Sequence, residues 1–225
     1  SKGDKLAFCV TIWGAPVIPE APEARPGTRG TGSRFLRRGP VSPGGALFVC
    51  GRLGLARAGL LALEQSGIAA EREYPAACTA HLLPHPQVAA GMALASVPGC
   101  RLMDVSDGLA RDLPRMLRAY GRDCGAEIIM RPEDVHPEAA AFARTLNEDP
   151  ARFAFLGGED YALLGSCPAD RLDRAREAVR EAAPDVSFLP IGHVTEKTGT
   201  TLNGCLLYTP DPADQQTRVQ SDAST

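Results

Sequence analysis

The chain has 225 residues, of which 44% are hydrophobic and 23% are charged, and its net charge is −3 at pH 7. This length suffices for a sizeable core in one large domain or two small ones. The slightly acidic balance argues against a nucleic-acid-binding protein, and the aromatic content of 5% argues against a surface that stacks bases. No run approaches the roughly 20 apolar residues of a membrane span, and no signal pattern is seen, so we expect a cytoplasmic protein without a membrane partner.

The seven cysteines are odd in number, and none of them stands at C-x-x-C spacing. Several lie in apolar runs, as in Leu47–Cys50. Buried free thiols in a reducing compartment are therefore favoured over a disulfide framework.

The first part of the chain predicts a strand and then a long loop. Residues 5–13 are rich in β-branched and aromatic side chains, and residues 15–32 contain four prolines. The basic residues Arg34, Arg37 and Arg38 follow. They fit either a solvated surface or a phosphate clamp, because arginine offers paired donors to phosphate oxygens.

We therefore divide the chain into three parts. Residues 1–32 form a leading strand and proline-rich loop, and residues 33–209 form the main domain. Residues 210–225 are polar and are expected to be disordered.

A strand is predicted over 46–50 and a helix over 55–65, joined by the turn Gly51–Gly54. Strand, glycine turn and helix also describe a phosphate-binding loop in outline. The glycine spacing matches neither common phosphate-loop motif and lysine is absent, so we favour a plain strand-to-helix connection.

Residues 67–86 show no helical or strand pattern and predict irregular structure. His81 and His85 stand four apart, a spacing that suits a metal only on a helix. Pro84 between them argues against a helix and therefore against a zinc site. A helix is expected over 87–95.

The densest group of functional side chains is Asp104–Leu109, in which two aspartates, one serine and one glycine fall within five positions. It stands between a short apolar strand, 101–103, and a segment with helical spacing of its apolar residues. Serine and aspartate are frequent at helix N-termini, whose free N–H groups suit phosphate. Carboxylates placed there require a cation such as Mg²⁺. Two interpretations stay open: a magnesium and phosphate site, or a helix cap at Asp107 with Asp104 at a solvated strand end.

A second group of this kind is Gly157-Gly158-Glu159-Asp160-Tyr161, which precedes an apolar strand. Glycines permit unusual backbone angles or the close approach of a ligand, and we expect the acids to face that ligand. An ordinary acidic loop explains any one of these residues but explains the whole run less well.

The remaining pattern completes the fold prediction. It indicates a strand over 126–130, helices over 137–146 and 169–182, extended segments over 186–189 and 191–194, and a hairpin around Asn203-Gly204. Helices and strands are mixed without strict alternation, so the fold class is α/β (α+β layered), with a mixed β-sheet on which helices pack.

The two acidic motifs, in this order, resemble those of thiamine-monophosphate kinase. That family shares a superfamily with aminoimidazole ribonucleotide synthetase and the hydrogenase maturation protein HypE. Further segments resemble the same family in the right order, at 38–47, 48–60, 83–88 and 191–194. The resemblance covers about residues 5–207 and implies a fold like the C-terminal domain of aminoimidazole ribonucleotide synthetase.

The resemblance implies transfer of the ATP γ-phosphoryl group to thiamine monophosphate, with Mg²⁺ as the cofactor that neutralises charge. Carried over position by position, it implies that Asp104 and Asp107 bind Mg²⁺. It also implies that Ser106 contacts ATP and that Arg38 holds the ATP phosphates. No catalytic residue is assigned.

On the substrate side, the resemblance implies that Glu159 contacts the thiamine part of the substrate. Gly157, Gly158 and Asp160 belong to the same loop. A C-terminal aromatic residue also faces the substrate in the family, and Tyr208 is the only candidate here.

The chain departs from the family pattern in its acidic residues. The N-terminal domain of the family supplies most metal-binding aspartates and makes the dimer, and its Gly-Asp-Asp-Ala type motif and Gly-Gly-Asp are absent here. At two further positions where the family has aspartate, this chain has Gly45 and Leu55. We therefore expect the C-terminal domain without the ATP-binding half, inactive alone and completed by a separate half or a homodimer. The alternatives are a non-catalytic module that binds thiamine phosphate or nucleotide, and a sister enzyme such as HypE.

Overall fold

The computed structural model describes residues 36–119 and 123–208. The strand predicted over 5–13, the proline-rich loop 15–32 and the polar tail from 210 lie outside the described residues.

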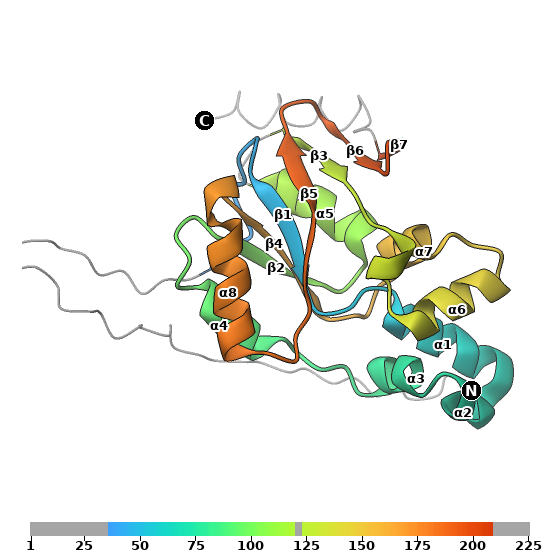
Figure 1. The fold of residues 1–225 in the computed structure, drawn as a ribbon. Helices are drawn as coiled ribbons and strands as arrows, with labels where there is room; N and C mark the ends of the chain where they lie inside the picture. The colour runs from blue at the N-terminus through green and yellow to red at the C-terminus, as the bar shows by residue number, and fades with distance from the viewer. Residues whose placement is uncertain (1–35, 120–122, 209–225) are drawn as a thin grey trace, which may run out of the picture. The chain divides into compact units, whose positions relative to one another are not determined.

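A seven-stranded mixed sheet forms the centre of the described part (Figure 1). The strand order is β2-β4-β1-β5-β3-β6-β7, and neighbours pair antiparallel except the parallel pair β3 and β6. This mixed sheet confirms the predicted fold class. The strands are β1 (Ala46–Cys50), β2 (Arg101–Val105), β3 (Gly125–Ile128), β4 (Ala162–Cys167), β5 (Phe188–Thr195), β6 (Gly199–Leu202) and β7 (Cys205–Tyr208).

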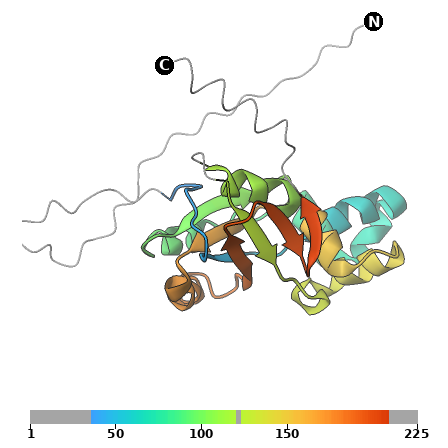
Figure 2. The same cartoon turned by 90° about the horizontal axis from the view of Figure 1, so that it is seen from above.

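Helices cover both faces of the sheet, and β1 is therefore buried along its whole length. Leu47 and Val49 belong to the larger apolar cluster, under α1 (Leu55–Ser66), α5 (Leu109–Leu117), α6 (Pro137–Thr145) and α7 (Pro150–Leu156). Phe48 and Cys50 belong to the smaller cluster, under α4 (Val88–Leu94) and α8 (Leu172–Ala182). Figure 2 shows the sheet between α5 on one side and α8 on the other. Such two-sided burial explains why the sequence of β1 is a continuous apolar run.

Helices in two regions of the chain were not predicted from the sequence. Residues 67–86, expected to be irregular, contain a 3₁₀ turn (Gly67–Ala69), α2 (Ala70–Glu73) and α3 (Pro75–Leu82). That prediction was wrong because α3 is held by tertiary packing: a Cβ on Gly59 of α1 would lie 2.0 Å from the Ala77 carbonyl oxygen of α3. The missing Cβ lets the two helix backbones touch.

Helix α7 also escaped the sequence analysis, although its start carries a clear signal. The Asp149 side chain accepts a hydrogen bond from the Arg152 N–H at 2.8 Å, and Pro150 occupies the first helical position. Both features are typical of helix N-termini. The predicted helices over 55–65, 87–95 and 137–146 and the hairpin at Asn203 are confirmed to within two residues at each end.

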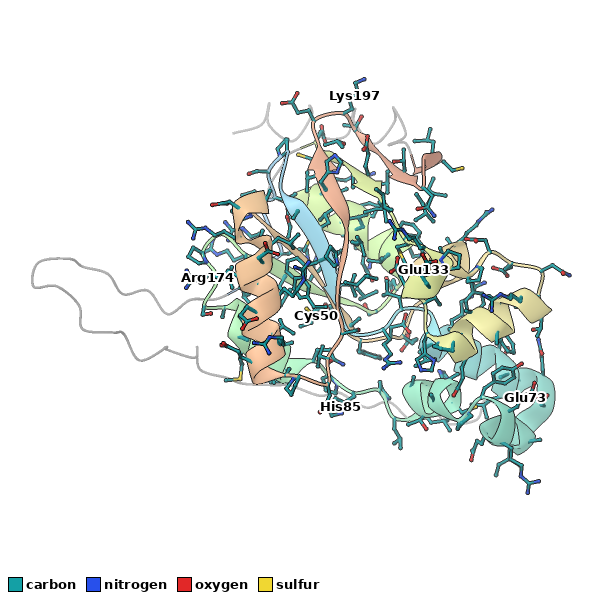
Figure 3. The ribbon with its side chains drawn as sticks, viewed as in Figure 1. Cys50, Glu73, His85, Glu133, Arg174 and Lys197 are labelled. Carbon is teal, nitrogen blue, oxygen red and sulfur yellow. The ribbon has the colours of Figure 1, made fainter. Side chains whose placement is uncertain are left out.

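The six cysteines within the described ranges are free, as predicted, and four of them are buried, whereas Cys124 is half-buried and Cys205 is exposed. Burial raises the pKa of Cys50 and of Cys100 to about 12. Cys50 lies in the cluster under α8, whereas Arg174 points away from the outer side of that helix (Figure 3). Thiols in this state are inert as nucleophiles near neutral pH.

None of the helices in the described ranges is long and apolar enough to cross a bilayer.

One edge of the sheet collects the loops that the sequence analysis singled out. Cys50, at the carboxyl end of β1, pairs with Leu163 near the amino end of β4 and with Phe188 at the amino end of β5. Val105, at the carboxyl end of β2, pairs with Ala162, also at the amino end of β4. The loops after β1 and β2 and the loop before β4 therefore open at the same edge.

Candidate functional site

The two acidic motifs form adjacent loops at this edge. The Glu159 N–H donates a hydrogen bond to the Ser106 carbonyl oxygen at 2.8 Å, and the Tyr161 N–H donates to the Val105 carbonyl oxygen at 3.1 Å. Glu159 and Tyr161 adopt left-handed backbone angles, with φ of 64° and 48°. Side chains disfavour this region, so both residues hold strained positions of the kind found at ligand sites. The structure thus joins two segments that are about fifty residues apart in sequence.

Glycines make this joint possible, because the two backbones touch. A Cβ on Gly108 would lie 2.4 Å from the Gly157 carbonyl oxygen, and a Cβ on Gly158 would lie 2.8 Å from the Ser106 carbonyl oxygen. Gly108 also has a φ of 93°. Any side chain at Gly108 would push the loops apart.

A buried aspartate, missed by the sequence analysis, organises the first loop. Asp112 is 1% exposed and accepts hydrogen bonds from the N–H groups of Ser106, at 3.0 Å, and Asp107, at 2.9 Å. Arg115 Nη1 donates to its other oxygen at 2.8 Å. A charged residue within the apolar stripe of Leu109 and Leu113 is the sequence signal that could have revealed it.

Asp112 changes two sequence-based expectations. The cap residue of α5 is Gly108, without a side-chain cap, so the alternative interpretation of Asp107 as a helix cap is wrong. The N–H groups of Ser106 and Asp107, expected to be free for phosphate, donate to a protein carboxylate instead. These two N–H groups are therefore not available to a phosphate.

Asp104 and Asp107 are the two carboxylates carried over as Mg²⁺ ligands. Asp104 is exposed on β2, and Asp107 has a side chain 41% exposed that accepts from Arg115 Nη1 at 2.5 Å. In the described ranges no three His, Cys, Asp or Glu side chains are arranged to hold a metal. Mg²⁺ uses one or two protein carboxylates together with phosphate oxygens and water. Two exposed carboxylates are therefore the number that one magnesium ion, held together with phosphate oxygens and water, would need from the protein.

Glu159 and Tyr161 form a polar pair beside this loop. The Tyr161 hydroxyl donates to Glu159 Oε2 at 2.9 Å. The pKa of Tyr161 is raised mainly by its hydrogen bond to Glu159. The charge of Glu159, burial and the charge of Asp104 raise it further. Glu159 is exposed, so its carboxylate is accessible to a cationic ligand near Asp104.

Asp160 faces away from that pair and fixes the start of α1. Its carboxylate accepts from the Gly54 N–H at 2.7 Å and from the Ala56 N–H at 3.0 Å. Burial raises the pKa of Asp160 to about 6, against the lowering effect of the N–H groups of Gly54, Ala56 and Leu55. The turn after β1 therefore gives its N–H groups to a carboxylate, which confirms the plain strand-to-helix connection.

The raised pKa of Asp160 predicts a pH dependence of stability. The folded chain holds this proton more tightly than the unfolded chain between the ordinary pKa of 3.8 and the folded pKa of about 6. Its contribution to the free energy of unfolding is full below 3.8 and is lost as the pH rises to about 6. We therefore expect the free energy of unfolding in urea of the natural chain, minus that of Asp160→Asn, to fall as the pH rises from 3.8 to about 6. A difference that stays constant would contradict the assignment.

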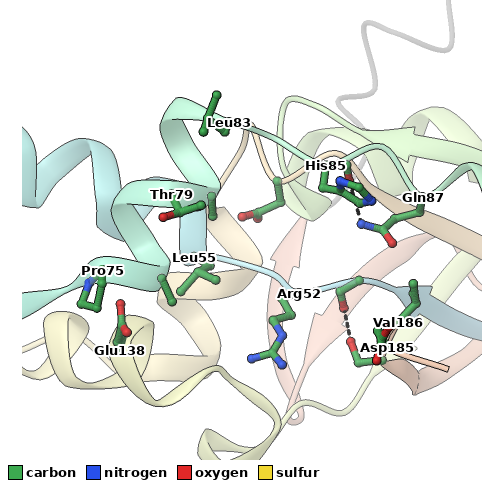
Figure 4. A pocket seen from close by; sticks show the side chains of 15 residues that line it. Arg52, Leu55, Pro75, Thr79, Leu83, His85, Gln87, Glu138, Asp185 and Val186 are labelled. Atoms are coloured by element: carbon green, nitrogen blue, oxygen red, sulfur yellow. Dashed lines mark hydrogen bonds between the residues drawn. The ribbon is translucent and has the colours of Figure 1, made fainter. Parts of the chain in front are cut away.

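A cavity of about 560 Å³ lies on the other side of Asp160. Figure 4 shows Arg52 between Leu55 and Glu138 on one side and His85 and Gln87 on the other. Asp160 is the one residue of the two acidic motifs in its lining. The carried-over residues Asp104, Ser106, Asp107, Glu159 and Arg38 lie outside this cavity.

Arg38 and Tyr208 lie in different places relative to the acidic loops. Arg38 lines a shallow hollow on α5 together with Arg115, the partner of Asp107. Tyr208 ends β7, six strand positions from β2. At about 4.8 Å per strand this separation is roughly 30 Å, so the structure does not bring the backbone of Tyr208 beside Asp104.

Comparison with known proteins gives the site its context. The thiamine-monophosphate kinase of Aquifex aeolicus is 28% identical over 175 residues, which cover 78% of this chain and 53% of that protein. The Bacillus subtilis enzyme of that name is 30% identical over 203 residues, covering 88% and 55%. The crystal structure of the Aquifex aeolicus enzyme superposes with a TM-score of 0.62 at 28% identity, covering 78% of this chain and 55% of that one. The chain is similar to the C-terminal part of thiamine-monophosphate kinases.

The chain spans about half the length of the thiamine-monophosphate kinases it matches. AaThiL complexed with AMPPCP and TMP has a TM-score of 0.63 and 27% identity over 80% of this chain and 53% of that one. Escherichia coli HypE shares the fold, with a TM-score of 0.57, 22% identity and coverage of 79% and 52%. No protein-family model matches the sequence.

Proposed function

We propose that this chain is the substrate-side part of an ATP-dependent thiamine-monophosphate kinase. The observation that carries the proposal is the backbone contact between the loops of Asp104–Gly108 and Gly157–Tyr161, which gathers three exposed carboxylates at one sheet edge. The similarity to thiamine-monophosphate kinases over most of this chain supports it.

The acidic character of the edge suits the proposed ligands. Bound Mg²⁺ would neutralise phosphate charge, and Asp104 and Asp107 would supply two of its oxygen ligands. Arg115 already holds one oxygen of Asp107, so this carboxylate would be shared between the arginine and the ion. Ser106, which is half-buried in the loop, would contact the nucleotide, and Arg38 would hold its phosphates.

Glu159 would bind the cationic ring of thiamine monophosphate. Its carboxylate is exposed and is oriented by the Tyr161 hydroxyl at 2.9 Å. The strained backbone at both residues fixes the direction of this pair. We add Tyr161 to the substrate-binding residues for that reason.

The proposed reaction is an in-line transfer. A phosphate oxygen of thiamine monophosphate would form a bond to the γ-phosphorus of ATP while the bond to the β–γ bridging oxygen breaks, which releases ADP. Such a transfer depends mainly on positioning and charge stabilisation. In the resembled family most metal-binding aspartates belong to motifs that this sequence lacks. We therefore propose that this chain alone does not turn over.

The test is calorimetric titration of the chain with thiamine monophosphate, followed by an assay for thiamine diphosphate with ATP and Mg²⁺. We expect binding without turnover, and about tenfold weaker binding for Glu159→Gln, as for the loss of one charged contact. The matched control is Glu181→Gln, an exposed glutamate on α8 that should bind like the natural chain. Equal affinity of the two variants would reject Glu159, and turnover by the chain alone would reject the proposed inactivity.

A module that binds thiamine phosphate or nucleotide without catalysis is the second candidate. It is favoured by Gly45 and Leu55, which stand where the resembled family has aspartates. Both are buried, and a Cβ on Gly45 would lie 2.9 Å from the Ser42 carbonyl oxygen, so neither place accommodates an exposed carboxylate. Binding of thiamine monophosphate without turnover by the full product of the gene would favour this module over the kinase.

A further inference from the structure

Four arginines line one shallow hollow of about 630 Å³ over α5. They are Arg38, Arg111, Arg115 and Arg118, and the rest of the lining is Ala110 and Pro114. We call this the arginine hollow. No carboxylate belongs to its lining within the described residues.

The helix geometry of α5 places its three arginines together. Positions 111, 115 and 118 follow the i, i+4, i+7 spacing of one helix face. The opposite face holds Leu109, Leu113 and Met116, which are fully buried. Because that opposite face is buried, the three arginine side chains stay together on the exposed face of α5.

Arg38 joins the hollow from a distant part of the sequence. The Leu102 N–H of β2 donates to the Arg37 carbonyl oxygen at 3.0 Å, and Arg101 Nε donates to the Pro40 carbonyl oxygen at 3.1 Å. The segment that carries Arg38 therefore runs beside β2, on the side where β2 has no neighbouring strand. This places a fourth positive charge against the arginine face of α5.

Like charges at these spacings destabilise a helix unless an opposite charge lies between them. Arg115 has such partners, since its Nη1 donates to both Asp107 and Asp112. Arg38 and Arg111 are exposed and have no carboxylate partner among the described residues. The hollow therefore carries positive charge that the described carboxylates do not balance.

We propose that Arg111 and Arg115 of the arginine hollow, beside Arg38, bind a phosphate or polyphosphate group. Guanidinium groups bind phosphate oxygens through paired N–H donors, and four of them line this hollow. Arg111 and Arg115 are the new members of the site, beside Arg38. Phosphate binding stands without the kinase proposal, and only the choice of the nucleotide as its source rests on it.

Arg115 connects the arginine hollow to the acidic loop. Both of its described bonds use Nη1, which leaves the Nε and Nη2 donors for a ligand. Asp107 competes with that ligand for the same guanidinium. Removing the Asp107 charge should therefore strengthen phosphate binding.

The test is titration of the chain with inorganic pyrophosphate at low ionic strength, without divalent cations, because salt screens exposed charges. We expect Arg111→Gln and Arg38→Gln to weaken binding about tenfold each, and Asp107→Asn to tighten it several-fold. Arg174→Gln, an exposed arginine on α8 outside the hollow, is the matched control and should bind as the natural chain does. Equal loss in the hollow variants and the control would overturn the proposal, as would equal affinity for pyrophosphate and chloride.

Competition then identifies the source of the phosphate. Displacement of pyrophosphate by ADP and not by thiamine monophosphate assigns the hollow to the nucleotide, and the reverse assigns it to the substrate. If neither competes while pyrophosphate still binds in an Arg111-dependent way, the phosphate site stands and the kinase proposal fails at this hollow.

Discussion

Gly108→Ala is expected to lower the free energy of unfolding by about 3 kcal/mol or more, since a strained backbone and an overpacked contact each cost about 1–3 kcal/mol. Gly108 has a φ of 93° and a ψ of 154°, a region that side chains rarely adopt. The new methyl group would also lie 2.4 Å from the Gly157 carbonyl oxygen. Urea unfolding followed by circular dichroism measures the loss.

The matched control separates backbone strain from the clash. Gly44 has a φ of 78°, and a Cβ built there meets nothing within 4 Å. Gly44→Ala therefore reports the cost of a positive φ without a clash, at about 1 kcal/mol. Equal losses in the two variants would show that the methyl group added at Gly108 meets no costly clash with the Gly157 carbonyl oxygen. Gly108→Ala should also abolish binding of thiamine monophosphate under conditions in which it is still folded.

Asp112→Ala is expected to cost about 1–3 kcal/mol for each backbone N–H that it leaves unpaired. Asp112 is 1% exposed, and two such groups, on Ser106 and Asp107, depend on it. The change also removes a partner of Arg115, which should then bind Asp107 alone. Chemical denaturation measures the first effect, and pyrophosphate titration of the folded variant measures the second.

An exposed aspartate on a helix provides the comparison for Asp112. The Asp173 side chain is 92% exposed and pairs with Arg176 three residues on, and Asp173→Ala should change the free energy of unfolding by about 0.5 kcal/mol or less. Asp112→Asn retains one oxygen acceptor and should fall between the two alanine variants. If Asp112→Ala proved as mild as Asp173→Ala, the first acidic loop would not depend on this carboxylate.

Local signals in the sequence were enough for most strands and for the positions of both acidic loops. The hairpin at Asn203 follows from turn chemistry, and the apolar run of β1 follows from burial on both faces. Helix α3 could not be predicted in this way, because its place depends on the contact of Ala77 with Gly59 of α1. Periodicity in a short alanine-rich segment carries little information about such a contact.

The sequence singled out candidate residues of the site but did not reveal the hydrogen bonds that hold its loops. Asp104, Asp107 and Glu159 were singled out from their neighbours in sequence, whereas the partners of Asp112 and Asp160 needed three-dimensional proximity. Asp160 was grouped with acids that face a ligand, yet its carboxylate accepts N–H groups 104 and 106 residues away. Sequence alone does not tell a carboxylate that binds a ligand from one that completes a helix.

The pairing of β1 has a consequence for synthesis of the chain. β1 is an early strand of the described part, and its two neighbours are β4 and β5, so that Ala46 pairs with Cys167 and with His193. During translation this wholly apolar strand leaves the ribosome with both edges unpaired and stays so until more than a hundred further residues have followed. Exposed strands of this kind favour aggregation, so nascent chains that stop before β4 should require a chaperone to stay soluble. The measurement is the solubility of ribosome-bound chains stalled before and after residue 195, where β5 ends. We expect only the longer chains to stay soluble without a chaperone.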